Sequence, residues 1–503
     1  MCHKFLNVLF DFAKKFQRKY IFIFFCAWLL NYPLSAHTAD LIELYQLACE
    51  NDSTFQKEIY AHQAASEIYT QAFSEMLPVL GFDAFYKYSE HKMLDNEVAV
   101  YNDNRARYPS KGFDLVLSQP VFSYPSMVHI SQAKEEVQRA DFNFQAAAQN
   151  LIFRVTEAYL NALEAKDVLR FSKAEEDAIS RHFNLAKERY ESGLIPIAEF
   201  HDAKATFAGA TTRRVRAEHS MEDAIEGLTE ITGTRIDSLK AINLPDINTE
   251  KMCATISSDS ESKTMRFDAI DVNRFNSLAP RKDEGYEGDA IPLILPEPDD
   301  VDTWVQATQK QNFGILARQK GLIIAEKEVK RQNGGHMPTV SLVGRLNRNV
   351  EGDSLYGGGS DIEKWEGSVE VKVPLFNGFS TSSKVREAKL LHKIAQQELE
   401  TEIRSVTRES KAAFFGIKSA IESIKALKQA LISNQIALYA KQEGFKSGMQ
   451  PTLAVTDAQR DLFQTKHEYA KSQYEYIIYS LRLKKAVGLL NQEDIKVVNS
   501  WLD

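Results

Sequence analysis

The side chains best suited to metal binding or nucleophilic catalysis are eleven histidines and four cysteines, and they are scattered along the chain. There is no His-Glu-x-x-His, no cysteine pair at zinc spacing and no Gly-x-Ser-x-Gly. His336 sits beside two glycines at an expected helix-to-strand junction, where it fits a capping or surface role. The glycines at 357–359 lack the Lys-Ser/Thr of a phosphate-binding loop. The sequence therefore predicts no enzyme, no cofactor and no metal site.

The remaining candidates surround two similar turns. The run ERYESG at 188–193 matches EGFKSG at 443–448, and each run is followed within three residues by proline. Glycine supplies the left-handed residue that ends a helix, and proline fits the first turn of the next helix. Both turns therefore predict the tips of helical hairpins. The candidate residues at and near these tips are Arg189, Tyr190, Gly193, Leu194, Glu199, Asp202, Phe445, Gly448, Met449, Gln450 and Asp457.

These turns belong to a repeat that covers most of the chain. Pro78 and Pro120 recur as Pro338 and Pro374, and the tip glycines are 255 residues apart. Each copy reads as a helix, two strands, a very long helix, a tight turn and another long helix. A duplicated unit of this kind is typical of two pseudo-equivalent parts of one ring.

The first 36 residues have the pattern of a signal peptide. Basic residues precede an apolar run at 20–30, which is followed by proline and the small residues Ser35 and Ala36. A retained membrane anchor is the competing interpretation. The net charge of −8, with no dense basic stripe, argues against nucleic-acid binding. Two cysteines fall in the leader, and the other two, Cys49 and Cys253, are far apart in sequence.

Four segments of about ten residues show the alternation of strands. The first, at 79–88, places Leu80, Phe82 and Tyr86 on one face and Asp83 on the other. The others are apolar at positions 113, 115, 117 and 121, at 340, 342 and 346, and at 369, 371, 373 and 375. A small soluble sheet with one wet face is the simpler interpretation. Aromatic apolar faces and polar, glycine-containing connections favour strands that cross a membrane.

Four such strands cannot close a barrel, and lipid does not tolerate an open sheet edge. Single-chain membrane barrels begin at about eight strands. The strands therefore require oligomerisation, and three copies would supply twelve.

The helical segments are unusually long. Residues 126–192 contain no proline or glycine, so they predict a rod of roughly 100 Å at about 1.5 Å per residue. Apolar residues alternate in steps of four and three, which indicates an alanine-rich coiled-coil seam. The seam positions are 151, 155, 158, 162, 165, 169, 179, 183, 186 and 190, and in the second copy 406, 413, 417, 420, 424, 427, 431, 438 and 445.

The chain then divides into a signal peptide (1–36), a first repeat (37–235), an insertion (236–300), a second repeat (301–490) and a C-terminal tail (491–503). The insertion is rich in serine, acidic residues and proline, with few periodic apolar residues. Such a composition indicates a surface segment that packs loosely around the rods or is partly disordered.

Several passages, in order along this duplicated frame, resemble the TolC-like outer-membrane efflux and secretion channels (outer membrane factors). The resemblance covers essentially the whole mature chain. The passages are 156–163, 167–169, 189–194, 336–339, 374–385 and 474–494.

The resemblance implies an α+β membrane protein that assembles as a homotrimer. A 12-stranded β-barrel would sit in outer-membrane lipid, and a 12-helix α-barrel would continue it as a periplasmic tunnel. The hairpin tips would form an aperture and meet a periplasmic adaptor (membrane-fusion) protein and an inner-membrane transporter of ABC or RND type. The adaptor would dock on Arg189, Tyr190, Gly193, Leu194, Gly448 and Met449.

At the aperture this chain departs from the family's namesake. There the second-repeat tip has an aromatic residue, an arginine and two aspartates, whereas this chain has Phe445, Gln450, Ala454 and Asp457. One acidic ring is therefore missing and an arginine-based ion pair cannot form. Glu199 and Asp202 of the first repeat would add carboxylates close by, and an acidic ring would attract cations. The alternative is that Asp202 and Asp457 are ordinary solvated helix residues.

Two classes of function remain open. One is a passive export duct for small molecules or secreted proteins, driven by an inner-membrane transporter. The other is a periplasmic coiled-coil adaptor or structural protein. The four paired amphipathic strands favour the duct, because an adaptor would have one hairpin and a lipoyl-like β domain.

Overall fold

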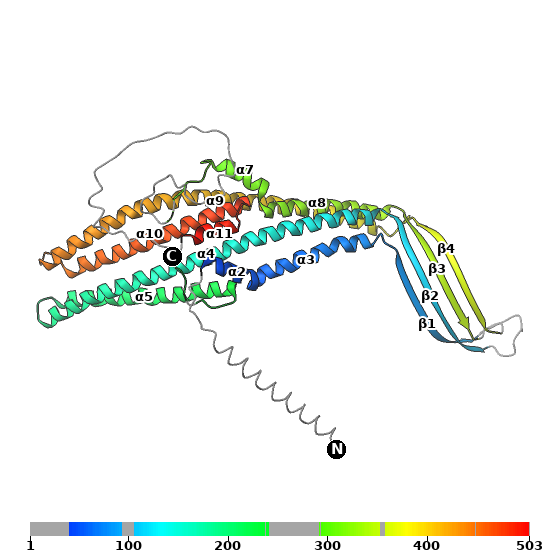
Figure 1. Cartoon of the computed structure of the whole chain (residues 1–503), viewed down its shortest axis with the longest axis horizontal. Helices are drawn as coiled ribbons and strands as arrows, with labels where there is room; N and C mark the ends of the chain where they lie inside the picture. The colour runs from blue at the N-terminus through cyan, green and yellow to red at the C-terminus, as the bar shows by residue number, and fades with distance from the viewer. Residues whose placement is uncertain are drawn as a thin grey trace, which may run out of the picture.

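The computed structural model describes residues 40–92, 105–236, 238–240, 291, 293–352, 358–447 and 449–501. Within these ranges the chain is a long rod with a four-stranded sheet at one end and two helical turns at the other (Figure 1). The expected signal peptide, most of the insertion at 236–300, and Gly448 lie outside the described residues, as do Cys2, Cys26 and Cys253.

The four predicted strands form one antiparallel sheet. They are β1 (Val79–Lys92), β2 (Arg105–Ser123), β3 (Thr339–Glu351) and β4 (Ser360–Lys372), in the order β1-β2-β3-β4. β2 pairs with β3, so the strands of the two repeats join in a single sheet. The strands contain 13 to 19 residues and so exceed the expected ten. The expectation for Val373 and Leu375 was wrong, because both lie beyond the end of β4.

The register aligns the apolar faces of all four strands. Phe82 lies opposite Leu115, Leu115 opposite Leu346, and Leu346 opposite Trp365. Side chains directly opposite each other in a sheet point to the same face. The apolar positions therefore share one face over this part of the sheet, whereas two residues nearer the strand connections, Arg348 and Glu363, lie on the same side.

The neighbouring positions form the other face of the sheet, and they are polar. Asp83 lies opposite Asp114, Asp114 opposite Asn347, and Asn347 opposite Lys364. The Asn347 amide donates to Asp114 across 2.8 Å. The sheet thus has one apolar face and one polar face.

Each repeat contains the predicted rod. Helix α4 (Tyr124–Glu191) has 68 residues and α9 (Ser380–Lys446) has 67, so each is about 100 Å long. The shorter helices α5 (Ile197–Thr232) and α10 (Thr452–Val487) return along them as antiparallel partners. Ser123 caps α4 with its hydroxyl, and Pro125 lies in the first turn.

The coiled-coil seam is confirmed in both rods. In α4 the buried seam residues are Leu151, Val155, Ala162, Ala165, Ile179 and Ala186. In α9 they are Val406, Ala413, Ile417, Ala420, Ile424, Leu431 and Phe445.

One helical expectation was wrong in an informative way. Residues 41–75 form two helices, α2 (Leu41–Asn51) and α3 (Ser53–Ser74), instead of one. The break occurs at Asp52, whose carboxylate accepts from the Phe55 backbone N–H at 2.8 Å. The second repeat breaks in the same way between α7 (Val301–Gln311) and α8 (Phe313–Asn333), where the Asn312 side chain accepts from the Ile315 N–H at 3.1 Å.

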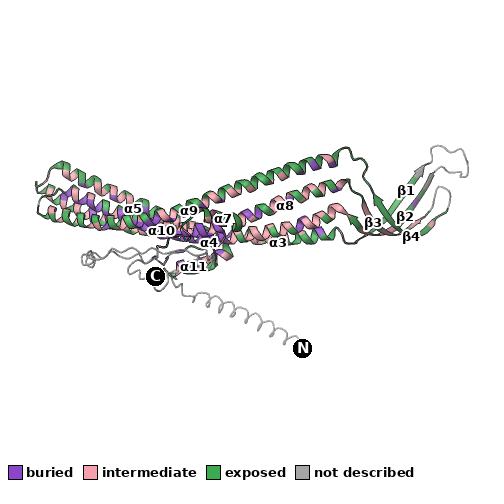
Figure 2. Ribbon diagram, turned by 90° about the horizontal axis from the view of Figure 1, so that it is seen from above, coloured by how far each residue is buried: buried purple, intermediate pink, exposed green. Residues whose placement is uncertain are grey.

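The best-buried region lies midway along the rod, where α2 and α7 pack on the long helices (Figure 2). The segment expected to be a tail contains a further helix, α11 (Gln492–Asn499), with an N-terminal capping box at Asn491. Ile495 and Val498 are buried in the core, and the Lys484 ammonium bonds to the buried Asp494 carboxylate at 2.6 Å. The C-terminal segment is therefore part of the core.

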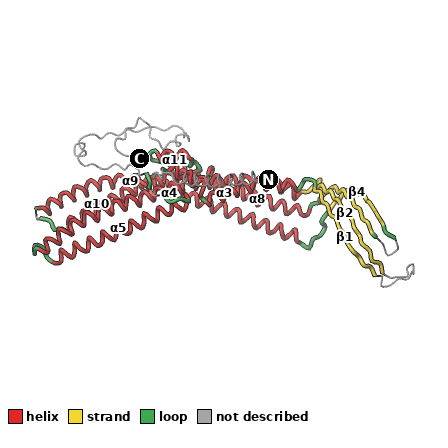
Figure 3. Tube along the Cα trace, turned by 60° about the horizontal axis from the view of Figure 1, so that its bottom comes forward, coloured by secondary structure: helices red, strands yellow, loops and turns green. Residues whose placement is uncertain are grey.

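Strands occupy only the end opposite the hairpin turns, and helices make up the rest of the described rod (Figure 3). His336 lies in the short 3-10 helix η2 (Gly334–His336), at the junction of α8 and β3 that the sequence predicts. Among the described helices, none is long and apolar enough to cross a bilayer.

Candidate functional site

The candidate site is the end of the rod where the two hairpins turn. In the first hairpin, Gly193 has a φ of 72°, and its N–H donates to the Tyr190 carbonyl at 2.9 Å. The Leu194 N–H donates to the Arg189 carbonyl at 2.8 Å. These bonds satisfy the last carbonyls of α4 and reverse the chain. Pro196 caps α5 one position earlier than expected, just before the first helical residue.

The second hairpin turns with a related pattern. The Gly444 carbonyl accepts from the backbone N–H groups of Met449, at 2.8 Å, and of Gln450, at 3.1 Å. Pro451 precedes α10 as Pro196 precedes α5. The candidate Gly448 lies outside the described residues.

Phe445 joins the two hairpins of the chain. Its ring is only 9% exposed. The Arg189 guanidinium of the first hairpin lies over this ring at 4.7 Å from the centroid, and the His182 ring meets it edge-on at 6.2 Å. A cation over an aromatic face is attractive by about 0.5–2 kcal/mol. Two predicted residues, Arg189 and Phe445, are thus brought together.

A second link between the hairpins involves Glu199. The hydroxyl of Thr452, at the start of α10, donates to a Glu199 carboxylate oxygen at 3.0 Å. Thr452 is buried, whereas Glu199 is half-buried in the first turn of α5. The Glu199 carboxylate therefore bonds to the second repeat within the same chain.

His182 and Gln459 form a third link. Their side-chain nitrogens, His182 Nε2 and Gln459 Nε2, are 3.2 Å apart. His182 Nδ1 and Gln459 Oε1 are buried and have no hydrogen-bond partner within the described residues. Burial, with the neighbouring Arg181 cation, lowers the pKa of His182 below its ordinary value.

The two aspartates of the site have different surroundings. Asp202 is exposed on α5. Asp457 is partly exposed on α10 and forms an ion pair with Arg460, one turn further along the helix, at 3.1 Å. No contact joins the two carboxylates within the described chain, and the Asp457 charge has a cation beside it.

Four aromatic rings stiffen the end of the first hairpin. Tyr190 stacks on Phe200 with centroids 5.0 Å apart, and Phe183 stacks on both Phe200, at 6.0 Å, and Phe207, at 5.4 Å. This stack fastens α4 to α5 just behind the turn. Of its members, only Tyr190 was singled out for the tip from the sequence.

The surface of the turns exposes several apolar side chains beside polar ones. Leu194 and Met449 are 73% and 77% exposed, and Ile197 and Leu453 next to them are also exposed. Gln450 is exposed beside Met449. Apolar side chains presented at the end of a rod are typical of a contact surface for another molecule.

Four residues of the site were not predicted from the sequence: Thr452, His182, Phe200 and Arg460. Only Arg460 had a readable signal, because it stands three residues after Asp457 on the same helix. The others depend on how the two hairpins pack. Within the described residues, no group of three metal-ligating side chains occurs.

Comparison with known proteins agrees with this geometry. The model of the "outer membrane efflux protein" family matches residues 44–234 and 304–489. The chain is 29% identical to the outer membrane protein TolC of Vibrio cholerae, over 97% of this chain and 99% of that protein. It is 20% identical to the proteases secretion protein PrtF of Dickeya chrysanthemi, over 93% and 92% of the two chains. The solved Campylobacter jejuni CmeC outer membrane channel has the same fold, with a TM-score of 0.69, 15% identity, and coverage of 92% and 90%.

The chain therefore belongs to the outer membrane efflux protein family. It is an outer-membrane channel of the efflux or type I secretion kind, and it extends into the periplasm. The family is one of transport channels and not of enzymes.

Proposed function

We propose that this chain works as a homotrimeric exit duct. Three copies would join their sheets into one 12-stranded barrel and their rods into a 12-helix periplasmic tunnel. The observation that carries this proposal is the apolar face around Phe82, Leu115 and Leu346, together with the outer edges of β1 and β4, which pair with no further strand among the described residues. An apolar face can contact lipid, but the unpaired backbone groups of an open sheet edge are not tolerated in the bilayer, so the edges must pair with neighbouring copies.

The polar face of the sheet supports the same arrangement. Asp83, Asp114, Asn347 and Lys364 would line the inside of the barrel, where water replaces lipid. Apolar side chains are also exposed on the helices at the two sides of the protomer. Tyr60 and Tyr69 of α3 and Leu390 and Ile394 of α9 would pack against the neighbouring copies.

The tip of the rod would have two roles, as the docking surface for partner proteins and as the gate of the duct. Arg189, Tyr190, Gly193, Leu194 and Met449, together with Gly448, would receive a periplasmic adaptor protein that links the duct to an inner-membrane transporter of ABC or RND type. The exposed Leu194 and Met449 support this docking role.

The aperture would be formed by Glu199, Asp202, Phe445, Gln450 and Asp457. The links of Phe445 to Arg189 and of Glu199 to Thr452 would hold the hairpins of each protomer together in the closed state. Asp457 from three protomers would supply one acidic ring, weakened by the adjacent Arg460. The limits 37–235 and 301–490 for the two repeats are part of this proposal.

Two substitutions to lysine at neighbouring positions test the barrel. Phe82→Lys places a charge on the apolar face, which should cost about 2–4 kcal/mol in lipid. Asp83→Lys places the same side chain on the polar face and serves as the control. Membrane fractionation and unheated gel electrophoresis should show a heat-resistant trimer for the wild type and for Asp83→Lys, and a loss of it for Phe82→Lys. A wild-type chain that migrates as a monomer, or equal behaviour of the two variants, would refute the proposal.

A further inference from the structure

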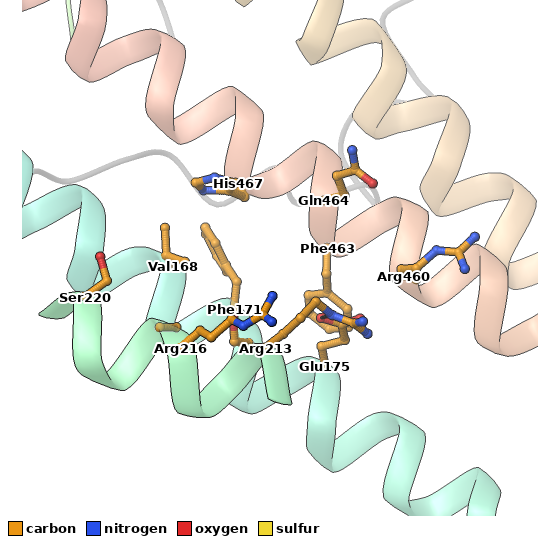
Figure 4. Close-up of a pocket in the computed structure, with 12 residues that line it drawn as sticks. Val168, Phe171, Glu175, Arg213, Arg216, Ser220, Arg460, Phe463, Gln464 and His467 are labelled. Atoms are coloured by element: carbon orange, nitrogen blue, oxygen red, sulfur yellow. Dashed lines mark hydrogen bonds and ion pairs between the residues drawn. The ribbon is translucent and has the colours of Figure 1, made fainter. Parts of the chain in front are cut away.

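A cavity of about 410 Å³ lies between α4, α5 and α10, away from the tip. Figure 4 shows that side chains from all three helices line it. Its residues on α4 are 168–175, which places them roughly 27–38 Å from the Gly193 turn at about 1.5 Å per residue. Its volume falls within the usual range of about 300–1,000 Å³ for small-molecule sites. It is separate from the apolar end of the hairpins, and it touches the proposed aperture only through Arg460, the ion-pair partner of Asp457.

The lining of this cavity is apolar and aromatic on two sides. Phe171 and Val168 come from α4, Ala217 from α5, and Phe463 from α10. Both phenylalanines are half-buried, so part of each ring is accessible from the cavity. Aromatic faces of this kind attract planar apolar groups.

The polar lining contains three guanidinium groups, those of Arg213, Arg216 and Arg460, and one carboxylate, that of Glu175. Arg213 already bonds to both oxygens of the buried Glu175, at 2.5 and 3.2 Å. This pair joins α4 to α5 and is satisfied without a ligand.

The other two arginines differ in how far they are compensated. Arg460 lies within 3.1 Å of Asp457 and 3.4 Å of Asp461 on its own helix. Arg216 has no ion-pair or hydrogen-bond partner among the described residues. Since a guanidinium binds a carboxylate or sulfonate with two parallel hydrogen bonds, Arg216 can accept an anion without losing a protein contact.

His467 completes the cavity and adds no charge at neutral pH. Burial, helped by the nearby Lys471 cation, lowers the pKa of His467 below its ordinary value, and Glu468 opposes this only partly. The imidazole is therefore an additional hydrogen-bonding group beside the aromatic lining.

We propose that this cavity binds a small aromatic monoanion, a carboxylate or sulfonate attached to a planar apolar group. Arg216 holds the anionic group, and Phe171 and Phe463 contact the rings. The charge excess of the arginines selects against cationic ligands of similar shape. The cavity shares Arg460 with the ion pair to Asp457, whereas Arg216, which holds the anion, is not part of the proposed aperture or docking surface.

Fluorescence titration of the purified protein in detergent tests the proposal with a matched pair of probes. The probe 8-anilinonaphthalene-1-sulfonate has the required sulfonate, and N-phenyl-1-naphthylamine is the same ring system without it. We expect saturable binding of the sulfonate after subtraction of protein-free micelles, and at least tenfold weaker binding to Arg216→Glu, because charge-assisted hydrogen bonds are lost. Arg216→Gln should show an intermediate loss.

The control variant is Arg404→Glu, which makes the same charge change on α9, where the side chain is 78% exposed. It should bind the sulfonate within twofold of the wild type, and the neutral probe should not distinguish Arg216→Glu from Arg404→Glu. Equal sulfonate affinity for these two variants, or no saturable binding to the wild type, would overturn the proposal. The readout requires no transport, so its failure leaves the export role untouched.

Discussion

Replacing Thr452 by valine should loosen the tip of the duct. Valine has nearly the shape of threonine, so the buried position stays filled while the hydroxyl that donates to Glu199 is removed. The two hairpins of each protomer then lose one of the bonds that join them. We expect the closed aperture to open more often.

The size of the effect follows from the surroundings of the bond. A hydrogen bond to a charged group contributes about 1.5–3 kcal/mol when it is buried. Glu199 is half-buried, so water can replace part of the lost bond, and about 1 kcal/mol per protomer is a better estimate. That corresponds to roughly a fivefold shift in the open–closed equilibrium for one hairpin pair, and about a hundredfold if three protomers open together.

Planar-bilayer recording measures this shift as the open fraction of single channels. Thr452→Ser keeps a hydroxyl at the same place and should behave like the wild type. Glu199→Gln should give a smaller shift than Thr452→Val, because its amide oxygen can still accept the bond. If Thr452→Val and Thr452→Ser have the same open fraction, the bond does not hold the aperture closed.

Four further predictions concern the tip and the core. The folded-state pKa of His182 lies below its unfolded value of about 6.5, so the hairpin seam should be fully stable above that pH and lose stability as the pH falls below it. Channel opening in bilayers should therefore increase at low pH, and His182→Gln should abolish this increase. Asp494→Asn leaves a buried lysine without its carboxylate and should cost about 3 kcal/mol or more in thermal unfolding, whereas the exposed Glu493→Gln should cost less than about 1 kcal/mol. Gly193→Val should strain the turn at its positive φ, although its Cβ would meet nothing within 4 Å, so export should fall while trimers still form on unheated gels. Asp457→Asn should reduce cation selectivity and block by multivalent cations in bilayers; unchanged values would show that Asp457 does not line the constriction.

The sequence predicted the strands and rods well because their residue patterns are periodic over long stretches. The alternation around Phe82 and Leu115 assigns one face of each strand, and the register then places those faces together. The rod from Tyr124 has no proline or glycine after its first turn, so its length could be read directly, whereas the rod from Ser380 contains Gly416 and Gly444 and was recognised as the second copy of the first.

Two features were not predicted because their signals depend on packing. The breaks at Asp52 and Asn312 are caused by side chains that cap the following helix, and Asp52 is also fixed by Arg154 at 2.5 Å. A polar residue inside a helical pattern is usually exposed, so only the tertiary contact identifies it as a cap. The short segment at 492–499 was interpreted as a tail because its helix is stable only when packed on the core.

At the tip, the residues themselves could be predicted from the sequence, but the contacts between them could not. The resemblance could place Phe445 and Glu199 at the aperture, but their partners Arg189 and Thr452 lie in the opposite repeat, and Thr452 is 253 residues from Glu199. No local pattern specifies such a pair, because it depends on how two hairpins cross.

Arg460 is different, since its distance of one helical turn from Asp457 could be read from the chain. Its position means that each acidic side chain of the proposed ring has a cation beside it. The opposite charges of Asp457 and Arg460 largely cancel for a permeating ion that is still far from the ring. The ring should therefore discriminate between cations and anions only when the ion comes close to the aspartates. Arg460→Gln should therefore increase cation selectivity in bilayer recordings, and it should do so only while Asp457 is present. An equal change in the Asp457→Asn background would show that Arg460 acts on the permeating ion directly and not through the aspartate ring.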